Sequence, residues 1–250
     1  MGYTIALAGK GGTGKTTLAA LIVRIIKEKK LGSILAVDAD PNSNLAQGLG
    51  LEVKETIGSI LDEISTGADK IPSGMSKDRF IEYRIQTAIV EGEGFDLLAM
   101  GRPEGPGCYC YVNNVLRNIV GKLIDDYDYV VIDNEAGLEH LSRRTTRSAD
   151  ALVVVSDATR VGLVSAKRMN ELTKELDIKI KKRLLVINQF NQDLDKEVIK
   201  DSKLEYIGNI PTDNHIAKIS LNGNSLLKLD EDTASLKALR RIGDKIWQKN

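Results

Sequence analysis

The chain has 250 residues, of which 42% are hydrophobic, and its 35 basic residues balance its 35 acidic residues. This length and composition are typical of a globular protein with a substantial core, so we expect residues 1–250 to form one domain. A net charge of zero gives no global attraction for nucleic acid or an anionic membrane, and we expect neither as a partner. No apolar run is long enough to span a bilayer and no secretion signal is recognisable, which predicts a cytoplasmic location.

Short runs rich in Val, Ile and Leu predict strands that are buried on both faces. These runs occupy residues 3–8, 33–40, 95–100, 129–133, 151–156, 183–188 and 205–211. Apolar residues at helical spacing occupy 14–30, 113–127 and 161–176. The alternation predicts a three-layer α/β fold with a mostly parallel sheet of seven or eight strands and helices on both faces. Residues 54–94 are the least regular part, and we expect them to form a helical excursion from the sheet.

The first strand leads directly into a glycine-rich phosphate-binding pattern. Residues 9–16 read GKGGTGKT, which matches the P-loop spacing of a glycine, four residues, and then Gly-Lys-Thr. In such a loop backbone N–H groups face the phosphates, and the following helix adds its positive end. Lys15 is expected to bridge the β- and γ-phosphates, and the Thr16 hydroxyl is expected to bind Mg²⁺. The pattern predicts an ATPase.

An additional lysine, Lys10, gives the loop the form KGGTGKT. This loop resembles the deviant P-loop of the superfamily that contains MinD, ParA and the nitrogenase iron protein. The resemblance implies that Lys10 reaches across a dimer interface to the nucleotide of the partner subunit. The interface would then be a nucleotide-promoted homodimer.

Aspartates follow two other predicted strands. Asp38 and Asp40 lie in VDADPNSNL, and Asp133 lies in VVIDNEAG. Carboxylates at the carboxyl ends of parallel strands face the ligand crevice. The superfamily resemblance implies that Asp38 lies near Mg²⁺ and its waters, that Asp40 positions the attacking water, and that the Gly137 N–H approaches the γ-phosphate. Asp133, at the end of its strand, is expected to hold the coordination shell of Mg²⁺.

Later in the chain, Asn188 ends a predicted strand, and Pro211 and Asp213 follow the next one. By the same resemblance these positions hold adenine, and the guanine-reading Asn-Lys-x-Asp pattern is absent, which favours ATP over GTP. We therefore expect Lys10, Lys15 and Asp40 to be catalytic. The predicted nucleotide-binding residues are Gly9, Lys10, Gly11, Gly12, Thr13, Gly14, Lys15, Thr16, Thr17, Asp38, Asp133, Gly137, Asn188, Pro211 and Asp213.

The two cysteines of the chain, Cys108 and Cys110, lie in the segment GPGCYCY. One Cys-x-Cys pair supplies only half of a four-thiolate metal site. A symmetric dimer would bring two such pairs together at its axis. Four thiolates accept Ni²⁺ or Zn²⁺, and they also suit an iron–sulfur cluster. A third possibility is that both are small buried hydrophobic residues.

The motifs AGKGGTGKTT, VDADPNSNLAQGLGL, GPGCYC and DNEAGLEHLSRRT together resemble the CooC/AcsF family over essentially the whole chain. These are MinD-type ATPases that assist nickel insertion into carbon monoxide dehydrogenase or acetyl-CoA synthase. The resemblance implies a metal ion bound by Cys108 and Cys110 between two protomers, with dimerisation promoted by nucleotide and by metal.

Two alternative functions remain open at this point. One is a positioning ATPase similar to MinD or ParA, and the other is an electron-transfer ATPase with a bridging cluster. In MinD a basic amphipathic helix at the C-terminus binds membrane. Here Leu236, Leu239, Ile242 and Ile246 share one face of the last predicted helix, and we expect that face to pack on the sheet instead. His140 lies beside the DNEAG motif. We expect it to be a surface residue or to contact a neighbouring residue that binds a ligand.

Overall fold

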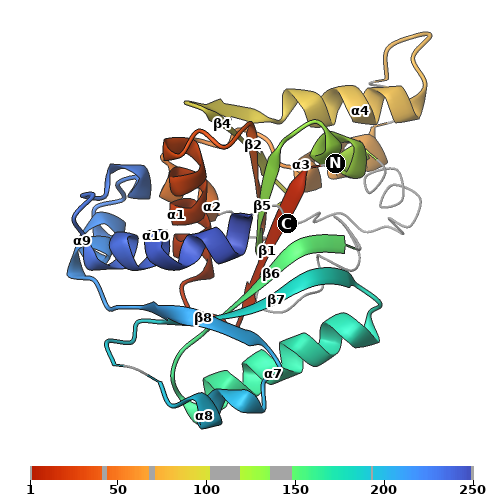
Figure 1. Ribbon diagram of the computed structural model, residues 1–250. Helices are drawn as coiled ribbons and strands as arrows, with labels where there is room; N and C mark the ends of the chain where they lie inside the picture. The colour runs from red at the N-terminus through yellow and green to blue at the C-terminus, as the bar shows by residue number, and fades with distance from the viewer. Residues whose placement is uncertain are drawn as a thin grey trace.

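The computed structural model describes residues 2–40, 44–67, 71–101, 119–135, 148–192 and 194–248. In these residues an eight-stranded sheet has the order β3-β4-β2-β5-β1-β6-β7-β8 (Figure 1). All neighbouring strands are parallel except β3 and β4. The predicted α/β fold with a mostly parallel sheet is therefore confirmed. The strands are β1 (Tyr3–Gly9), β2 (Ile34–Ala39), β3 (Val90–Gly92), β4 (Phe95–Ala99), β5 (Tyr129–Asn134), β6 (Ser148–Ser156), β7 (Lys179–Asn188) and β8 (Glu205–Ile210).

Helices cover both faces of the sheet, as the alternation predicts (Figure 1). They are α1 (Lys15–Glu28), α2 (Asn44–Leu49), α3 (Ile57–Thr66), α4 (Lys77–Thr87), α7 (Arg160–Glu175), α8 (Lys196–Lys200), α9 (Asn214–Leu221), the 3₁₀ helix η2 (Leu226–Lys228) and α10 (Ala234–Trp247). Residues 119–125 are also helical. None of the helices in the described ranges is both long and apolar enough to cross a membrane.

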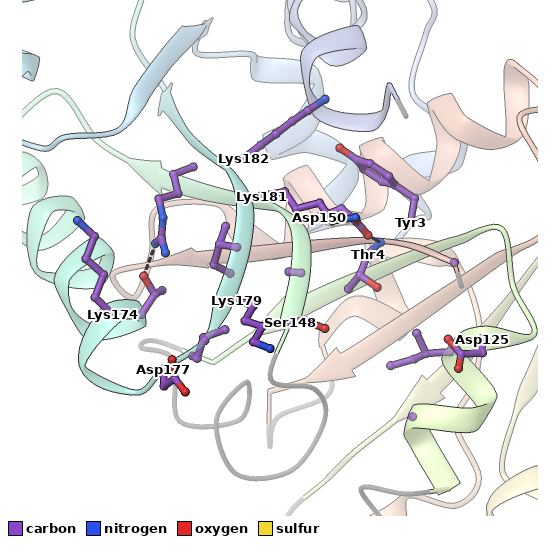
Figure 2. A pocket seen from close by; sticks show the side chains of 18 of the residues that line it. Tyr3, Thr4, Asp125, Ser148, Asp150, Lys174, Asp177, Lys179, Lys181 and Lys182 are labelled. Atoms are coloured by element: carbon purple, nitrogen blue, oxygen red, sulfur yellow. Dashed lines mark hydrogen bonds and ion pairs between the residues drawn. The ribbon is translucent and has the colours of Figure 1, made fainter. Parts of the chain in front are cut away.

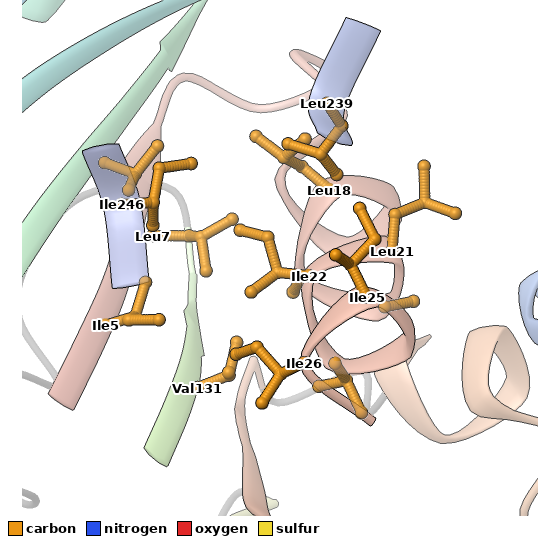
Figure 3. Close-up of a cluster of buried hydrophobic side chains, with 14 of the residues drawn as sticks. Ile5, Leu7, Leu18, Leu21, Ile22, Ile25, Ile26, Val131, Leu239 and Ile246 are labelled. Atoms are coloured by element: carbon orange, nitrogen blue, oxygen red, sulfur yellow. The ribbon is translucent and has the colours of Figure 1, made fainter. Parts of the chain in front are cut away.

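The first face of the sheet packs against α1 and α10. Figure 3 shows Ile22 and Ile26 of α1 directed towards Leu7 of β1 and Val131 of β5. Leu236, Leu239, Ile242 and Ile246 of α10 are buried in the same cluster. Each such side chain contributes about 1.5–3 kcal/mol when it is fully buried. The prediction that the C-terminal helix packs on the sheet is therefore confirmed.

The second face carries two hydrophobic clusters. One joins α3, α4 and residues 119–124 to β2, β4 and β5, and the other joins α7 and α8 to β1, β6 and β7. Residues 54–94 contain α3, α4 and the strand β3, and the two helices have clear start signals. Thr56 and Ser59 form a reciprocal capping box at α3, and Ser76 caps α4.

Three strands differ from the prediction, and one of them, β6, begins at Ser148 and not at residue 151. Strand β3 was not predicted; it has three residues, VEG, and forms an antiparallel pair with β4. The start of β7 was predicted at residue 183, whereas β7 begins at Lys179. The added residues of β7 are lysines and isoleucine at a strand end that is partly exposed, so no continuous apolar run marks them.

Candidate functional site

The P-loop joins β1 to α1 at the carboxyl end of the sheet. Gly12 and Gly14 have φ values of 79° and 87°, which L side chains rarely adopt. A Cβ atom at Gly9 would lie 2.3 Å from the carbonyl oxygen of Val155 on β6. At Gly11 and Gly12 it would meet nothing within 4 Å. The loop is therefore packed tightly on its sheet side and open on its outer side, where a phosphate group can approach the backbone.

The two lysines of the loop have different environments. Lys15 is buried, with 7% of its surface exposed, and its ammonium donates to the Lys10 carbonyl oxygen at 3.2 Å. Burial lowers the Lys15 pKa, and Asp133, Asp40 and Glu135 oppose this shift. The Lys10 side chain is exposed. Lys15 thus belongs to the interior of its own site, whereas Lys10 is accessible from outside.

Asp38 and Asp133 lie side by side on neighbouring strands. They are register partners in the β2–β5 pair, and their exposed fractions are 0% and 1%. Asp38 accepts hydrogen bonds from the backbone N–H groups of Leu45 (2.8 Å) and Asp40 (3.2 Å). Burial, and to a lesser degree the charges of Asp133 and Asp40, raise the Asp38 pKa to about 7. Its carboxylate holds the start of α2 against the end of β2.

Asp133 has unused acceptor capacity. Neither of its carboxylate oxygens has a hydrogen bond of normal geometry among the described residues, although the nearby Thr16 hydroxyl still lowers its pKa. Burial dominates and raises the Asp133 pKa to about 6. Buried carboxylate oxygens without a partner, beside a hydroxyl, are the hard donors that Mg²⁺ prefers. The residues present therefore fit Mg²⁺, which Thr16 and Asp133 would hold.

Asn188 contacts the P-loop directly. Its side-chain N–H group donates to the Thr13 carbonyl oxygen at 2.8 Å. A Cβ atom at Gly14 would lie 2.3 Å from the same nitrogen, so only glycine permits this contact. Asn188 at the end of β7 thus fixes the P-loop from two strands away. Its predicted contact with adenine stays a prediction.

Pro211 and Asp213 follow β8 at the same carboxyl end of the sheet. Asp213 caps α9 through the His215 N–H (2.9 Å), and its second oxygen accepts from the Ser235 N–H (3.1 Å) and hydroxyl (2.8 Å). These hydrogen bonds, acting against burial, lower the Asp213 pKa. Both carboxylate oxygens of Asp213 are therefore used to hold the loop, so we expect it to shape an adenine site without contacting the base through them.

A cavity of about 350 Å³ lies beside this loop. Phe190, Asn191 and Gln192 line it after β7, and Pro211 lines it after β8. The Asn191 side-chain oxygen accepts from the Thr212 N–H at 2.9 Å and joins the two loops. Asn191 was not among the predicted site residues. The sequence feature that could have identified it is a polar side chain three positions beyond Asn188, a strand-end residue that was predicted to be part of the site.

Asn134 is a second residue that the sequence analysis did not select. It is 1% exposed and follows Asp133 on β5. Its side-chain N–H group donates to the Leu7 carbonyl oxygen of β1 at 2.8 Å. Asn134 therefore ties the end of the strand that carries Asp133 to the strand that enters the P-loop.

Several predicted site residues lie outside the described residues. They are Cys108, Cys110, Gly137 and His140. Within the described ranges no group of three or more His, Cys, Asp or Glu residues could hold a metal ion. The described site residues lie together at the carboxyl end of the sheet. They are the P-loop, Asp38, Asp40, Asp133, Asn188 and Pro211. The thiolate site stays a prediction.

Comparisons with known proteins agree with this geometry. The family model described as "CobQ/CobB/MinD/ParA nucleotide binding domain" matches residues 4–227. An uncharacterized ATP-binding protein of Methanocaldococcus jannaschii is 44% identical over 250 residues, covering 98% of each chain. The carbon monoxide dehydrogenase accessory protein CooC of Rhodospirillum rubrum is 28% identical over 238 residues, covering 90% of this chain and 89% of that protein.

Solved structures give the same fold. MinD of Pyrococcus horikoshii, complexed with Mg-ADP, has a TM-score of 0.71 at 21% identity, over 99% of this chain and 97% of that chain. A ParA family ATPase of Chlorobium tepidum has a TM-score of 0.72 at 19% identity, covering 100% of both chains. At this level of identity the likeness concerns the fold alone.

The sheet order, the P-loop and the buried aspartates define a P-loop nucleotide-binding protein. The chain belongs to the CobQ/CobB/MinD/ParA nucleotide-binding family. ATP-binding proteins of the MinD/ParA group are ATPases, and the chain is one of them. The prediction of an ATPase is therefore confirmed.

Proposed function

We propose that this ATPase is a metal-delivery protein that holds a nickel ion between two protomers for insertion into carbon monoxide dehydrogenase or acetyl-CoA synthase. The observation that carries the proposal is the Cys108-x-Cys110 pair, the only cysteines in a chain that is similar to CooC over 90% of its length. Thiolates are soft ligands that suit nickel, and a cytoplasmic location keeps them reduced. Zn²⁺ suits the same four thiolates.

Dimerisation would complete this site. Members of the MinD/ParA family dimerise, and Lys10 is exposed at the open side of the P-loop, where a partner can be reached. In the proposed dimer Lys10 of each protomer contacts the nucleotide of the other. Each protomer supplies Cys108 and Cys110, so only the dimer offers four thiolates.

The described residues support roles in ATP hydrolysis. Lys15, buried beside Asp133, would bind the phosphates, and the ordered N–H groups of the P-loop would stabilise charge that develops on them. Mg²⁺ would neutralise phosphate charge when bound. Asp40, next to buried Asp38, would orient the attacking water. Gly137 would contact the γ-phosphate, so that loss of this phosphate loosens the dimer and releases the metal.

Family membership also favours a positioning ATPase similar to MinD as a second function. One observation weakens a membrane-binding version of it. The apolar face of α10, which includes Leu239 and Ile246, is buried against β1 and α1 (Figure 3). That face is therefore not available to insert into a bilayer. An electron-transfer ATPase with a bridging cluster is the third alternative.

Native mass spectrometry of the anaerobic, reduced protein tests the metal-delivery proposal. One Ni²⁺ per dimer, lost in Cys108→Ala/Cys110→Ala while ATP binding is retained, is the expected result. Two outcomes would contradict the metal-delivery proposal. Unchanged nickel stoichiometry in the double variant would exclude the thiolate site, and a brown protein with a cluster EPR signal would favour the electron-transfer alternative.

A further inference from the structure

A large cavity lies at the amino ends of the strands, at the end of the sheet opposite the nucleotide site. It has a volume of about 1490 Å³. It is lined by the first residues of β1, β6 and β7, by the end of α7 and by the helix at residues 119–125. The P-loop, in contrast, follows the last residue of β1. A seven-residue strand spans about 20 Å, so the two sites are well separated.

This cavity is rich in basic side chains, and we call it the cationic groove. Its basic residues are Lys122, Lys174, Lys179, Lys181, Lys182 and Arg183. Its acidic residues are Asp125, Asp150 and Asp177. Because the whole chain has no net charge, an excess of three positive charges in one groove is a local feature. Figure 2 shows Lys174 and Asp177 on one side, Lys179 and Lys181 on β7 in the middle, and Asp125 on the far side.

Half of these cations already have partners within the protein. Lys181 pairs with Asp150 at 2.7 Å, Lys182 donates to the Gln248 carbonyl oxygen at 2.8 Å, and Arg183 donates to Asn170 at 3.1 Å. These three shape the wall of the groove.

The other three, Lys122, Lys174 and Lys179, are exposed, and none of their ammonium groups has an ion pair or hydrogen bond with the described residues. All three line the groove, so their charge is available to a ligand there.

Tyr3 adds a polar group without a partner. Its side chain is 7% exposed and lines the groove, and its hydroxyl has no hydrogen-bond partner among the described residues. Burial and the charge of Asp150 raise the Tyr3 pKa to about 12, so the hydroxyl remains a donor at neutral pH. Because this hydroxyl oxygen is itself buried, Tyr3 contributes to the wall of the groove and offers no group to an external ligand.

We propose that the cationic groove binds an acidic, extended segment of a partner protein. Its volume exceeds the roughly 300–1,000 Å³ of small-molecule sites, which favours a chain segment over a free anion. The three aspartates among its cations would repel a uniform polyphosphate, whereas a peptide can place neutral or basic residues opposite them. This proposal concerns a site other than the nucleotide and cysteine sites, and it holds for any of the functions considered above.

Fluorescence anisotropy with a labelled glutamate-rich peptide of about 12 residues tests the proposal. We expect binding at 50 mM salt that weakens at least tenfold at 300 mM. Lys174→Glu/Lys179→Glu should weaken binding at least tenfold. Lys174→Ala/Lys179→Ala should also weaken binding, but less than the glutamate variant does. Lys77→Glu/Lys218→Glu, which reverses two exposed lysines of α4 and α9 outside the groove, should change the affinity less than twofold.

Four results would overturn the proposal. The first is no binding at 50 mM salt, which would leave these lysines as charges that protect a strand end from aggregation. The second is equal weakening by the groove and control variants. The third is displacement of the peptide by Mg-ADP, which would place it in the nucleotide site. A short DNA duplex that binds as tightly and with the same sensitivity to the groove variants would also contradict a protein partner.

Discussion

Asp38 and Asp133 are register partners at the carboxyl ends of β2 and β5, and both carboxyl groups are almost completely buried. The only buried cation close to Asp133 among the described residues is Lys15. Two acids thus face one cation. Such a site is electrostatically unfavourable when it is empty and becomes favourable when it holds a magnesium–nucleotide complex.

This arrangement predicts that the free protein loses stability as pH rises. The pKa values in the folded state, about 7 for Asp38 and about 6 for Asp133, lie above the unfolded value of about 3.9. Between these values the folded state binds more protons, so the free energy of unfolding falls as pH rises and the loss is complete above about pH 7. We expect the Tm without nucleotide to fall by about 8–16 °C from pH 5 to pH 8. Scanning calorimetry with Asp38→Asn, whose profile should be flatter, checks this. A rising profile would contradict it.

Asn188 is expected to support nucleotide binding through the P-loop. Asn188→Ala removes the hydrogen bond to the Thr13 carbonyl oxygen, which is worth about 1–2 kcal/mol. We therefore expect the Kd for a fluorescent ATP analogue to rise about 5- to 30-fold. Asn224→Ala, in the loop after α9, serves as the control and should leave the Kd unchanged. If both variants bind equally well, Asn188 does not position the loop.

Two glycines of the P-loop should respond differently to alanine. At Gly14 a Cβ atom would collide with the Asn188 side chain, and φ is +87°, so Gly14→Ala should lower the Tm and abolish ATP binding. At Gly11 the Cβ atom would meet nothing, so Gly11→Ala should keep the wild-type Tm to within about 2 °C. It should still weaken ATP binding, because it narrows the open side of the loop. Thermal unfolding with and without ATP separates the two effects, and a Gly14→Ala protein with normal Tm and binding would refute this description of the loop.

The different burial of the two P-loop lysines predicts different defects. Lys15→Ala should lose ATP binding, because its buried ammonium lies inside the site of its own protomer. Lys10→Ala should bind ATP with near-normal affinity in the monomer but fail to dimerise with ATP and lose at least tenfold in turnover. Analytical ultracentrifugation combined with an equilibrium ATP-binding assay distinguishes the two. A Lys10→Ala protein that dimerises normally would remove the role of Lys10 across the interface.

Much of the fold could be predicted because its signals are local. Buried parallel strands such as β5 and β6 are continuous apolar runs, and α1 places Leu18, Ile22 and Ile25 on one buried face. The strand order is not a local property, and the sequence analysis gave none. The early start of β7 was missed because Lys179 and Lys181 lie at a strand end where lysine side chains remain in solvent.

The candidate site, like the fold, could be predicted where its signals are local and not where they depend on distant segments. The P-loop spacing identified the backbone that faces the phosphates, and the strand-end rule identified Asp38 and Asp133. Neither rule gives hydrogen bonds between distant segments, so the contacts of Asn188 with Thr13 and of Asn134 with Leu7 were found only in the structure. The single-domain organisation and the roles of Cys108 and Cys110 stay predictions.

The most direct test of the account is the linkage between ATP and nickel. The nickel affinity of Asp40→Ala, chosen because it should bind ATP without hydrolysing it, is measured anaerobically by calorimetry with and without Mg-ATP. If only the ATP-bound dimer completes the thiolate site, ATP must raise the nickel affinity at least tenfold, and nickel must raise the ATP affinity by the same factor. Equal nickel affinity with and without ATP would contradict the account.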